Sequence, residues 1–444
     1  MYWISKTFHS IRRFRRRTLL LLAALGPGII TMVADNDAGG ISTYAQTGSK
    51  TGFSLLWAFI ILVPMAYYVQ EMTVRLGAVT KRGHAEAIFD GFGKFWGWFS
   101  IFDLAVINWL TLVTEYIGMT QAMRLFNIPE WVTFIGVTIL MTVIVITGRY
   151  WTFEKITLFF CFFNFVYIPA AFWAMKTGNV NEGWLAVGKG FWPGTPTGLG
   201  GVALLTLIMA NIGTTITPWQ IFFQQSAVVD KGMDIRDIRY GKIDTLVGSF
   251  TTCVVAAFII IATAGVFFYH PGGPLPVESA AQTAALMPTV MPAGTHWGQW
   301  ARVLFAIGLF DAGLLGALCI SLSTSWAMGE VFGWAHSLNR SVREAPWFYF
   351  AYVAMLLAAG IVSVTSSIEV QNTITIFVQV VAVTLLPAAL VFLILLLNDK
   401  ELMGAHTNTR WQNIANWSIV VFVIVVSTLY GISVLFPELF TFGG

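Results

Sequence analysis

The feature that most constrains this chain is a series of long apolar segments. Each can cross a lipid bilayer as a helix, which takes about 20 apolar residues. Only 11% of the residues are charged and 57% are hydrophobic, whereas a soluble domain carries about 25% charge. The sequence therefore predicts an all-α polytopic membrane protein. Its eleven expected transmembrane helices lie at 19–43, 52–76, 99–124, 131–148, 154–176, 200–229, 243–269, 298–331, 346–367, 374–398 and 412–436.

Basic residues between these segments predict how the chain sits in the membrane. Only five of the 25 Lys and Arg fall on one side, and these are Lys50, Arg124, Lys176, Lys189 and Arg302. Loops rich in Lys and Arg favour the cytoplasmic side. We therefore expect a multi-pass protein of the cell (plasma or inner) membrane with a basic cytoplasmic tail at 1–18. An odd number of crossings then leaves the C-terminus outside.

Several classes of function lack their usual residues. The chain contains no HExxH, GxSxG or GxxxxGK[ST] motif, the patterns of metalloproteases, serine hydrolases and phosphate-binding loops. Its three cysteines stand singly in separate apolar segments, and its six histidines lie outside or at the ends of those segments. We expect no enzyme, no cofactor and no nucleic-acid partner. The expected partners are the lipid bilayer and a small solute, with a monomer as the simplest assembly.

Two of the apolar segments are interrupted near their middle. The first contains Asp35, Asn36 and Asp37 followed by Gly39 and Gly40. A carboxylate at membrane depth costs about 3 kcal/mol on insertion scales, and each glycine weakens a helix by about 1 kcal/mol. A kink whose acids face water is one interpretation. The other is an unwound segment whose free carbonyls and carboxylate bind a cation.

The sixth segment repeats this interruption. Pro218 cannot donate a backbone hydrogen bond, and Gly213 with three threonines precedes it. Interruptions at corresponding places in two halves are typical of inverted-repeat transporters with a midplane site. We therefore expect repeats at 19–176 and 200–398, an outer loop at 177–199 and a peripheral helix at 412–436. The outer loop at 270–297 is either a short surface helix or flexible packing.

A known family shares these features. Gly26-Pro27-Gly28, Asp37-Ala38-Gly39-Gly40 with Gln46, Gly52 to Trp57 and Leu76 to Thr80 together resemble the first two helices of the Nramp divalent-metal transporters. The likeness continues in the sixth segment and covers most of the eleven, although the fourth, fifth, ninth and eleventh match mainly in hydropathy. The resemblance implies a LeuT-type 5+5 inverted repeat with broken helices 1 and 6. It also implies uptake of manganese or iron together with protons.

The chain departs from that family in its first and third helices. The helix 1 motif of the family is Asp-Pro-Gly-Asn; here Asp37 is kept, Ala38 replaces Pro and Gly40 replaces the coordinating Asn. On the third helix the family has an Asp and a Glu three residues apart. Here Leu112 replaces the Asp while Glu115 remains.

The sixth and ninth helices depart as well. Thr217 stands where the family has a metal-binding Met, and Trp219 and Gln224 stand where it has His. The segment 346–367 lacks the arginines that the family links to proton release. This pattern is similar to the prokaryotic Nramp-related magnesium transporters, a branch that is not proton-coupled.

These departures suit a hard cation. Replacing a soft thioether with Thr217 leaves oxygen ligands, and Mg²⁺ prefers octahedral oxygen coordination and retains water. Losing the Asn side chain at Gly40 opens room for such water. The predicted metal site comprises Asp37, Gly40, the carbonyls of Ala34 and Thr214 that the alignment implies, Thr217 and Gln379. The predicted cavity and pathway residues are Asp35, Glu115, Trp219 and Gln224, while Asp311 and Glu330 are expected to tie helices together.

Electrical energy makes coupling to protons unnecessary. A divalent cation gains about 4.6 kcal/mol on entering a cell at 100 mV, negative inside, which is worth about three decades of concentration. We therefore expect uncoupled uptake of partly hydrated Mg²⁺, and also of Mn²⁺. The alternatives are proton-driven uptake of Mn²⁺ or Fe²⁺, or an amine or amino-acid carrier of the same fold in which Trp219 faces an organic cation.

Overall fold

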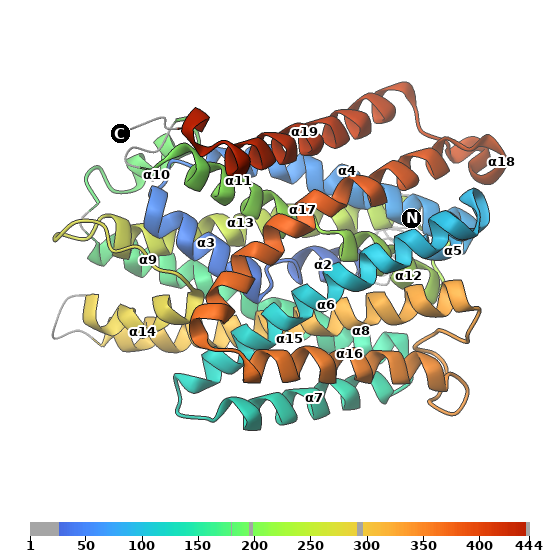
Figure 1. Cartoon of the computed structure of the whole chain (residues 1–444), viewed down its shortest axis with the longest axis horizontal. Coiled ribbons are helices and arrows are strands. Elements are labelled where there is room, and N and C mark those ends of the chain that lie inside the picture. Colours follow the sequence, from blue (N-terminus) through green and yellow to red (C-terminus); the bar gives the residue numbers. More distant parts are fainter. Residues whose placement is uncertain (1–25, 179, 195–198, 291–295, 441–444) are drawn as a thin grey trace, which may run out of the picture.

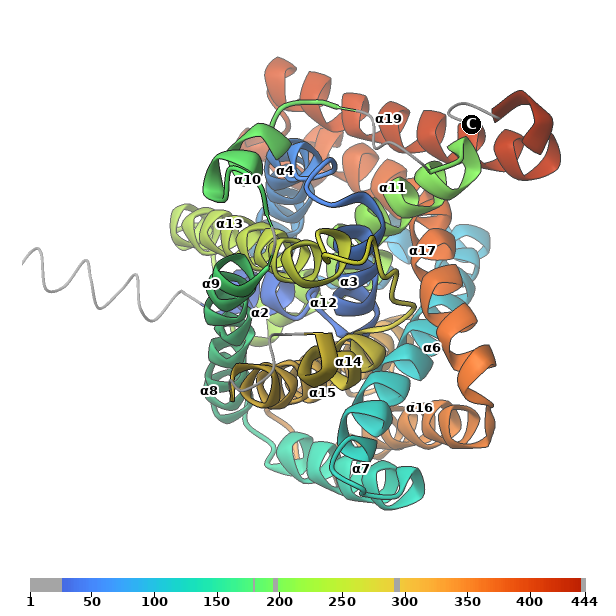
Figure 2. The ribbon, with the colours of Figure 1, turned by 90° about the vertical axis from the view of Figure 1, so that its left-hand side faces the viewer.

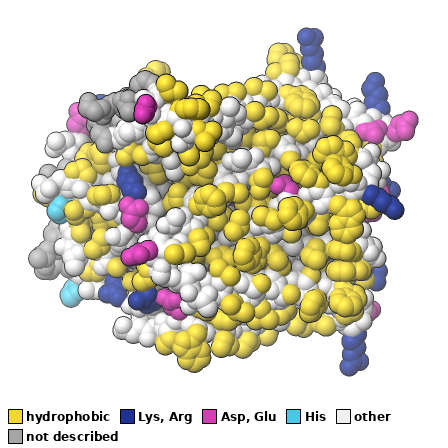
Figure 3. All heavy atoms as spheres, viewed as in Figure 1, with side chains coloured by type: hydrophobic (Ala, Val, Ile, Leu, Met, Phe, Trp, Pro, Cys, Tyr) yellow, Lys and Arg dark blue, Asp and Glu magenta, His cyan; other side chains and the backbone are white. Residues whose placement is uncertain are grey.

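The computed structural model describes residues 26–178, 180–194, 199–290 and 296–440. The predicted tail at 1–18 and the first part of the segment at 19–43 lie outside these residues. Within the described part every regular element is helical, and the helices lie roughly along one direction (Figure 1). Hydrophobic side chains cover most of the surface between two ends where charged side chains gather (Figure 3). An all-α membrane protein is thereby confirmed.

The spans follow the predicted order, with some boundaries moved. Nine helices or joined helix pairs of the described residues are long and apolar enough to cross a membrane, and Glu130–Ile146 is a shorter apolar helix. The span expected at 374–398 begins earlier, at Ile368, and the one expected at 99–124 begins at Lys94. The spans that are continuous helices are α4 (Trp57–Thr80), α6 (Lys94–Arg124), α7 (Glu130–Ile146), α13 (Ile238–Thr263), α15 (Trp297–Phe332), α16 (Pro346–Thr365), α17 (Ile368–Asn398) and α19 (Arg410–Leu435).

The first and sixth spans are each broken into two helices, as predicted. The first consists of α2 (Pro27–Val33) and α3 (Ala38–Thr51), and the sixth of α11 (Gly201–Thr215) and α12 (Pro218–Asp230). Asp37 caps α3 by accepting a hydrogen bond from the Gly40 N–H, and Pro218 opens α12 at a position where a proline needs no donor. In the end view of Figure 2, α2, α3 and α12 lie inside a ring of other helices.

The fifth span is interrupted too, which the sequence analysis did not predict. It runs through α8 (Tyr150–Cys161), a 3₁₀ turn η1 (Phe162–Val166) and α9 (Tyr167–Thr177). The seventh span, α13, continues into a π-helical turn η2 (Ala264–Phe268). Both irregular turns pack against neighbouring spans, η1 against α15 and η2 against α3.

The connections contain further short helices. The loop at 270–297 forms the helix α14 (Ala280–Val290), so the helical interpretation of this loop is confirmed. The other long loop holds α10 (Trp184–Gly190), and α10 and α14 lie at the same end of the bundle (Figure 1). At the opposite end lie α5 (His84–Phe92) and α18 (Lys400–Met403), while η3 (Gly404–His406) and η4 (Pro437–Phe440) are single 3₁₀ turns.

Candidate metal site

Three oxygens converge beside Gly40, at the start of α3. The position that a Cβ atom on Gly40 would occupy lies 2.4 Å from Thr214 Oγ1, 3.1 Å from the Asp35 carbonyl oxygen and 3.2 Å from Asp37 Oδ1. The two helix breaks therefore meet at this point, and only a residue without a side chain fits there. The room that we expected for water is filled in part by the Thr214 hydroxyl.

Asp37 combines a structural and a free carboxylate oxygen. Its Oδ1 accepts a hydrogen bond of 2.6 Å from the Gly40 N–H, which caps α3. Its Oδ2 is buried and has no hydrogen-bond partner among the described residues. The Thr214 hydroxyl lacks a partner as well. Because buried polar atoms are normally hydrogen-bonded, these atoms are candidate ligands.

The two predicted carbonyl ligands are released from helical hydrogen bonding by different means. The helical partner of the Ala34 carbonyl is the N–H of Ala38, and this N–H donates instead to Glu115 Oε2 at 2.9 Å. The helical partner of the Thr214 carbonyl is residue 218, a proline with no N–H. Within the described residues neither carbonyl accepts a backbone hydrogen bond from outside its helix. Both are available to a cation.

Glu115 touches the break rather than an open cavity. It is fully buried, and its second oxygen accepts a hydrogen bond of 3.2 Å from the Thr114 hydroxyl. Gly316 of α15 leaves it the necessary space, since a Cβ there would lie 2.9 Å from Glu115 Oε2 and 3.0 Å from the Asp37 Cβ. Glu115 therefore holds the first turn of α3 in place.

Gln379 reaches the breaks from α17. Its side chain is fully buried, and neither amide atom has a hydrogen-bond partner among the described residues. A Cβ on Gly39 would lie 2.1 Å from Gln379 Nε2, and a Cβ on Gly213 would lie 2.0 Å from the Gln379 carbonyl oxygen. Gly213 thus lets α11 approach the backbone of α17 closely. The amide of Gln379 is thus placed beside α3.

Asp35, predicted to line the pathway, lies buried near Asp37 in this closed structure. Its carboxylate is fully buried, and neither oxygen has a hydrogen-bond partner among the described residues. It lies within electrostatic range of Asp37 and close to the Gln220 side chain. With Glu115, which interacts with Asp37, three carboxylates lie in the same small region, and no Lys, Arg or His pairs with any of them in the described part of the chain.

Thr217 and Gln220 form the start of α12, and the sequence analysis named only the first of them. Thr217 is the N-cap residue, and its backbone N–H donates to Gln220 Oε1 at 3.0 Å. A threonine followed three residues later by Gln is a recognised helix-start pattern, so this signal could have been found. Gln220 also links the break to α4 through a hydrogen bond of 3.3 Å from Gln70.

Trp219 and Gln224 are engaged by neighbouring helices. The Gln224 amide donates to Thr245 Oγ1 of α13 at 2.8 Å. Trp219 is fully buried and packs edge-on against Phe223, and its carbonyl accepts a hydrogen bond from Ser323 of α15. The geometry gives Trp219 no exposed face for an organic cation.

A polar pocket lies on the α14 side of the site. It is lined by parts of α3, α11 and α17 and includes Gln46, Lys50, Glu278 and Glu369. Gln46 is nine residues beyond Asp37 on the same chain segment, which is about 13 Å along a helix. Thr47, the residue after Gln46, accepts a hydrogen bond of 2.8 Å from the Asn211 amide, which ties α3 to α11 here. Asp35, Asp37 and Thr214 are themselves fully buried, so the site is closed towards this pocket.

The opposite end is closed by the start of α2. Asp244 of α13 accepts hydrogen bonds from the N–H groups of Gly26, Gly28 and Ile29, at 3.0, 2.6 and 3.2 Å. A buried ion pair of 2.5 Å between Lys231 and Glu154 ties α12 to α8 nearby. The converging oxygens are thus enclosed from both ends.

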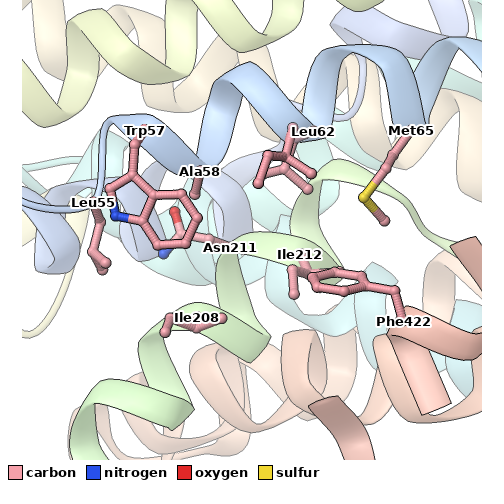
Figure 4. A pocket seen from close by; sticks show the side chains of 10 residues that line it. Leu55, Trp57, Ala58, Leu62, Met65, Ile208, Asn211, Ile212 and Phe422 are labelled. Atoms are coloured by element: carbon pink, nitrogen blue, oxygen red, sulfur yellow. The ribbon is translucent and has the colours of Figure 1, made fainter. Parts of the chain in front are cut away.

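A second pocket is apolar and lies elsewhere. Leu55, Trp57, Leu62 and Phe422 line it between α4, α11 and α19, and Asn211 is its one amide or charged side chain among the residues that line it (Figure 4). This pocket lacks the acidic groups that a metal ion needs. In the described residues no group of three or more His, Cys, Asp or Glu could hold a metal, so a metal site must rely on backbone and amide oxygens.

The two acids of α15 turn out differently. Glu330 is a tie between helices, as predicted, because it accepts hydrogen bonds from the N–H groups of Ala85 and Glu86 and from the Ser226 hydroxyl. Asp311 is not: both of its carboxylate oxygens are buried without a hydrogen-bond partner among the described residues. The expectation of an interhelical tie was wrong for Asp311.

Comparison with known proteins places this geometry in a family. The family model described as natural resistance-associated macrophage protein-like (Nramp) matches residues 28–433. A divalent metal cation transporter MntH of Listeria welshimeri is 25% identical over 92% of this chain and 89% of its own length. Another MntH, of Staphylococcus aureus, is 26% identical over 94% and 92%.

Solved structures show the same fold. A mutant form of a manganese transporter of Eremococcus coleocola aligns with a TM-score of 0.75 at 21% identity, over 94% of this chain and 88% of its own. MhsT in complex with L-phenylalanine aligns with a TM-score of 0.54 at 17% identity, over 93% and 97%. The fold is the LeuT-type inverted repeat with broken helices 1 and 6. The chain belongs to the Nramp family.

Proposed function

We propose that this protein is a secondary transporter that carries divalent metal cations into the cell, with Mg²⁺ as its main substrate and Mn²⁺ as a second one. The relatives named divalent metal cation transporters support the general class. The observation that carries the proposal is that the Ala34 and Thr214 carbonyls at the two helix breaks lack their helical N–H partners, while Asp37 Oδ2 is buried without a hydrogen-bond partner among the described residues. Acidic and carbonyl oxygens at a membrane midplane are the expected ligands of a small hard cation.

The ligand set favours magnesium over softer metals. Asp37 Oδ2, the two carbonyls and the Gln379 amide oxygen make four oxygens, whereas Mg²⁺ takes about six. We infer that retained water supplies the rest, with the hydroxyls of Thr214 and Thr217 as its hydrogen-bond partners. Thr217 stands at the position where a methionine would provide a soft sulfur ligand. Gly40 contributes by leaving the Thr214 hydroxyl its place.

We also propose that uptake is not coupled to protons. The α16 segment Pro346–Thr365 contains no basic residue. A membrane potential of 100 mV alone supplies about 4.6 kcal/mol for a divalent cation. Uptake should therefore respond to voltage and be indifferent to a proton gradient.

The proposed direction follows from the distribution of charge. We propose that the end with α5 and α18 faces the cytoplasm of the cell membrane, which places the polar pocket with Gln46 and Glu278 outside. The repeats then comprise 19–176 and 200–398, with α19 peripheral. A cation would pass from this pocket to the closed site and leave after α2 moves away from Asp244.

Uptake into proteoliposomes tests the proposal. Vesicles with a potassium diffusion potential, negative inside, are loaded with a Mg²⁺-sensitive dye or with a pH dye. Wild type should accumulate Mg²⁺ without internal acidification, and Asp37→Asn should reduce uptake at least tenfold, because asparagine keeps the cap on α3 but removes the charge. The matched control is Asp103→Asn on α6, twelve residues from Glu115 and so about 18 Å away along the helix.

The second candidate function is proton-coupled Mn²⁺ uptake, which the manganese transporter from Eremococcus coleocola favours by its name. It predicts Mn²⁺-dependent acidification and little Mg²⁺ uptake in the same vesicles. Either result would replace our proposal. Full Mg²⁺ uptake by Asp37→Asn would refute the assignment of the site.

A further inference from the structure

A second group of unpartnered polar atoms lies between the fifth and eighth spans. Asp311 of α15, Tyr167 of α9 and Asn164 of η1 are 4%, 0% and 1% exposed. Both carboxylate oxygens of Asp311, the Tyr167 hydroxyl and both amide atoms of Asn164 lack a hydrogen-bond partner among the described residues. Buried polar atoms without partners cost about 1–3 kcal/mol each. Five of them in one region therefore indicate a ligand.

The 3₁₀ turn places two of these side chains on one face. A 3₁₀ helix has about three residues per turn, so Cys161, Asn164 and Tyr167 follow one another along the same side. All three are buried, whereas Phe162 and Phe165 between them are 70% and 39% exposed. The interruption of the fifth span thus directs a row of polar groups into the protein.

Asp311 faces this row from α15. Its carboxylate lies within electrostatic range of both Cys161 and Tyr167, the residues one 3₁₀ turn on either side of Asn164. Gly308, one helical turn before Asp311, makes the approach possible, since a Cβ there would lie 2.5 Å from the Tyr167 hydroxyl oxygen. Phe305 then packs edge-on against the Tyr167 ring.

The region lies on a different face of α15 from the metal site. Gly316, which contacts Glu115 and Asp37, follows Asp311 by five residues, a rotation of about 140° around the helix. The α6 side of α15 therefore supports the metal site, and the η1 side carries Asp311. A ligand held at Asp311 would fix α15 against α9 without touching the transported ion.

The charge and the number of oxygens select the ligand. In the described residues no Lys, Arg or His pairs with Asp311, so an ionised Asp311 needs a bound cation as its counterion. A divalent ion would leave an excess positive charge, and a proton would supply a single donor for several acceptors. We propose that Asp311, Tyr167 and Asn164 form a second cation site that binds one small monovalent cation, with sodium as the ion to test.

Thermal unfolding of the full-length protein in detergent tests this site. NaCl is titrated against N-methylglucamine chloride at constant ionic strength, without divalent metal, and a ligand that binds only the folded state raises the unfolding midpoint with its concentration. Wild type and the control Asp103→Asn should respond equally to Na⁺. Asp311→Asn should lose the response. Tyr167→Phe, which keeps the ring against Phe305, should raise the half-saturating Na⁺ concentration about tenfold, as loss of about 1.4 kcal/mol would.

Three results would overturn the inference. The first is a wild-type midpoint that ignores Na⁺ at both pH 6 and pH 9, which is the behaviour of a carboxyl that simply holds a proton. The second is a Na⁺ response of undiminished size in Asp311→Asn. The third is an unchanged half-saturating concentration in Tyr167→Phe, a variant that tests the site even if Asp311→Asn does not fold.

Discussion

Placing asparagine at position 40 is a sharp test of how the two helix breaks meet. Asparagine stands there in the family motif that the first helix resembles, so sequence alone would call Gly40→Asn a restoration. The structure predicts the opposite. A Cβ at this position lies 2.4 Å from Thr214 Oγ1, which real Cβ atoms essentially never show, and 3.1 Å from the Asp35 carbonyl oxygen, which would have to shift by a few tenths of an ångström.

The size of the effect follows from the overlap. Overpacking a close-packed interior costs about 1–3 kcal/mol, and the branched Thr214 side chain has few other rotamers. A penalty of that size on the transport-competent state reduces uptake by about 5- to 150-fold. Gly40→Ala adds the same Cβ and should already lose most of this activity. Thr214→Ala removes the overlapping hydroxyl, so the pair Gly40→Asn/Thr214→Ala should recover at least half of the lost free energy.

Initial rates of Mg²⁺ uptake in proteoliposomes measure this double-mutant cycle. Gly136→Ala is the matched control, because Gly136 also lies within a spanning helix but has no atom near the position of a Cβ. It should transport at the wild-type rate. Wild-type uptake by Gly40→Asn, or equal losses in Gly40→Asn with and without Thr214→Ala, would refute the packing that we describe.

Three further predictions address selectivity, closure and pH. Thr217→Met should raise the uptake of Mn²⁺ relative to Mg²⁺ about tenfold in competition assays, because it adds a soft ligand; an unchanged ratio would place residue 217 outside the metal's reach. Asp244→Asn leaves one carbonyl oxygen for three N–H groups, so amide hydrogen exchange at Gly26, Gly28 and Ile29 should accelerate about tenfold. Unchanged exchange would show that Asp244 does not hold α2. Burial lowers the pKa of His84, in the connecting helix α5, to about 4. This histidine is neutral in the folded protein and takes up a proton on unfolding when the pH lies below its ordinary pKa. The free energy of unfolding should therefore be full above pH 6.5 and fall by on the order of 3 kcal/mol towards pH 4. Thermal unfolding of His84→Gln should lack that part of the acid dependence, and an identical pH profile would contradict it.

The fold could be predicted from the sequence because the membrane imposes simple rules. A span needs a fixed length of apolar residues, and each of the long helices can be recognised in that way. Proline and paired glycines marked both breaks, because their backbone effects are local. The interruption at η1 was missed although a local signal was present. Pro169 in the first turn of α9 has no N–H for the carbonyl of Phe165 in η1. Packing of η1 against α15 accompanies the 3₁₀ turn.

The site was harder to predict because its contacts are not local. Asp37 was predicted to bind the metal and Asp35 to line the pathway, and both carboxylates are buried in one region. Gln224 was predicted to line the cavity, but its side-chain amide donates a hydrogen bond to Thr245 of a neighbouring helix. Space at a glycine depends on which atoms fill it, and no pattern in the chain shows that Thr214 occupies the room beside Gly40.

Two substitutions of Glu115 can distinguish a structural role of this side chain from an electrostatic one. Glu115 was predicted to line the cavity, and its Oε2 accepts a hydrogen bond from the Ala38 N–H, which leaves the Ala34 carbonyl without that helical partner. Glutamine keeps a carbonyl oxygen for that hydrogen bond but removes the charge, while alanine removes both. If the hydrogen bond from the Ala38 N–H matters most, Glu115→Gln should retain uptake within about threefold of wild type. Glu115→Ala should then lose at least tenfold, because a hydrogen bond to a charged group is worth about 1.5–3 kcal/mol. Equal losses in the two variants, measured as Mg²⁺ uptake at saturating voltage, would show that the charge itself is needed and that the released carbonyl is incidental.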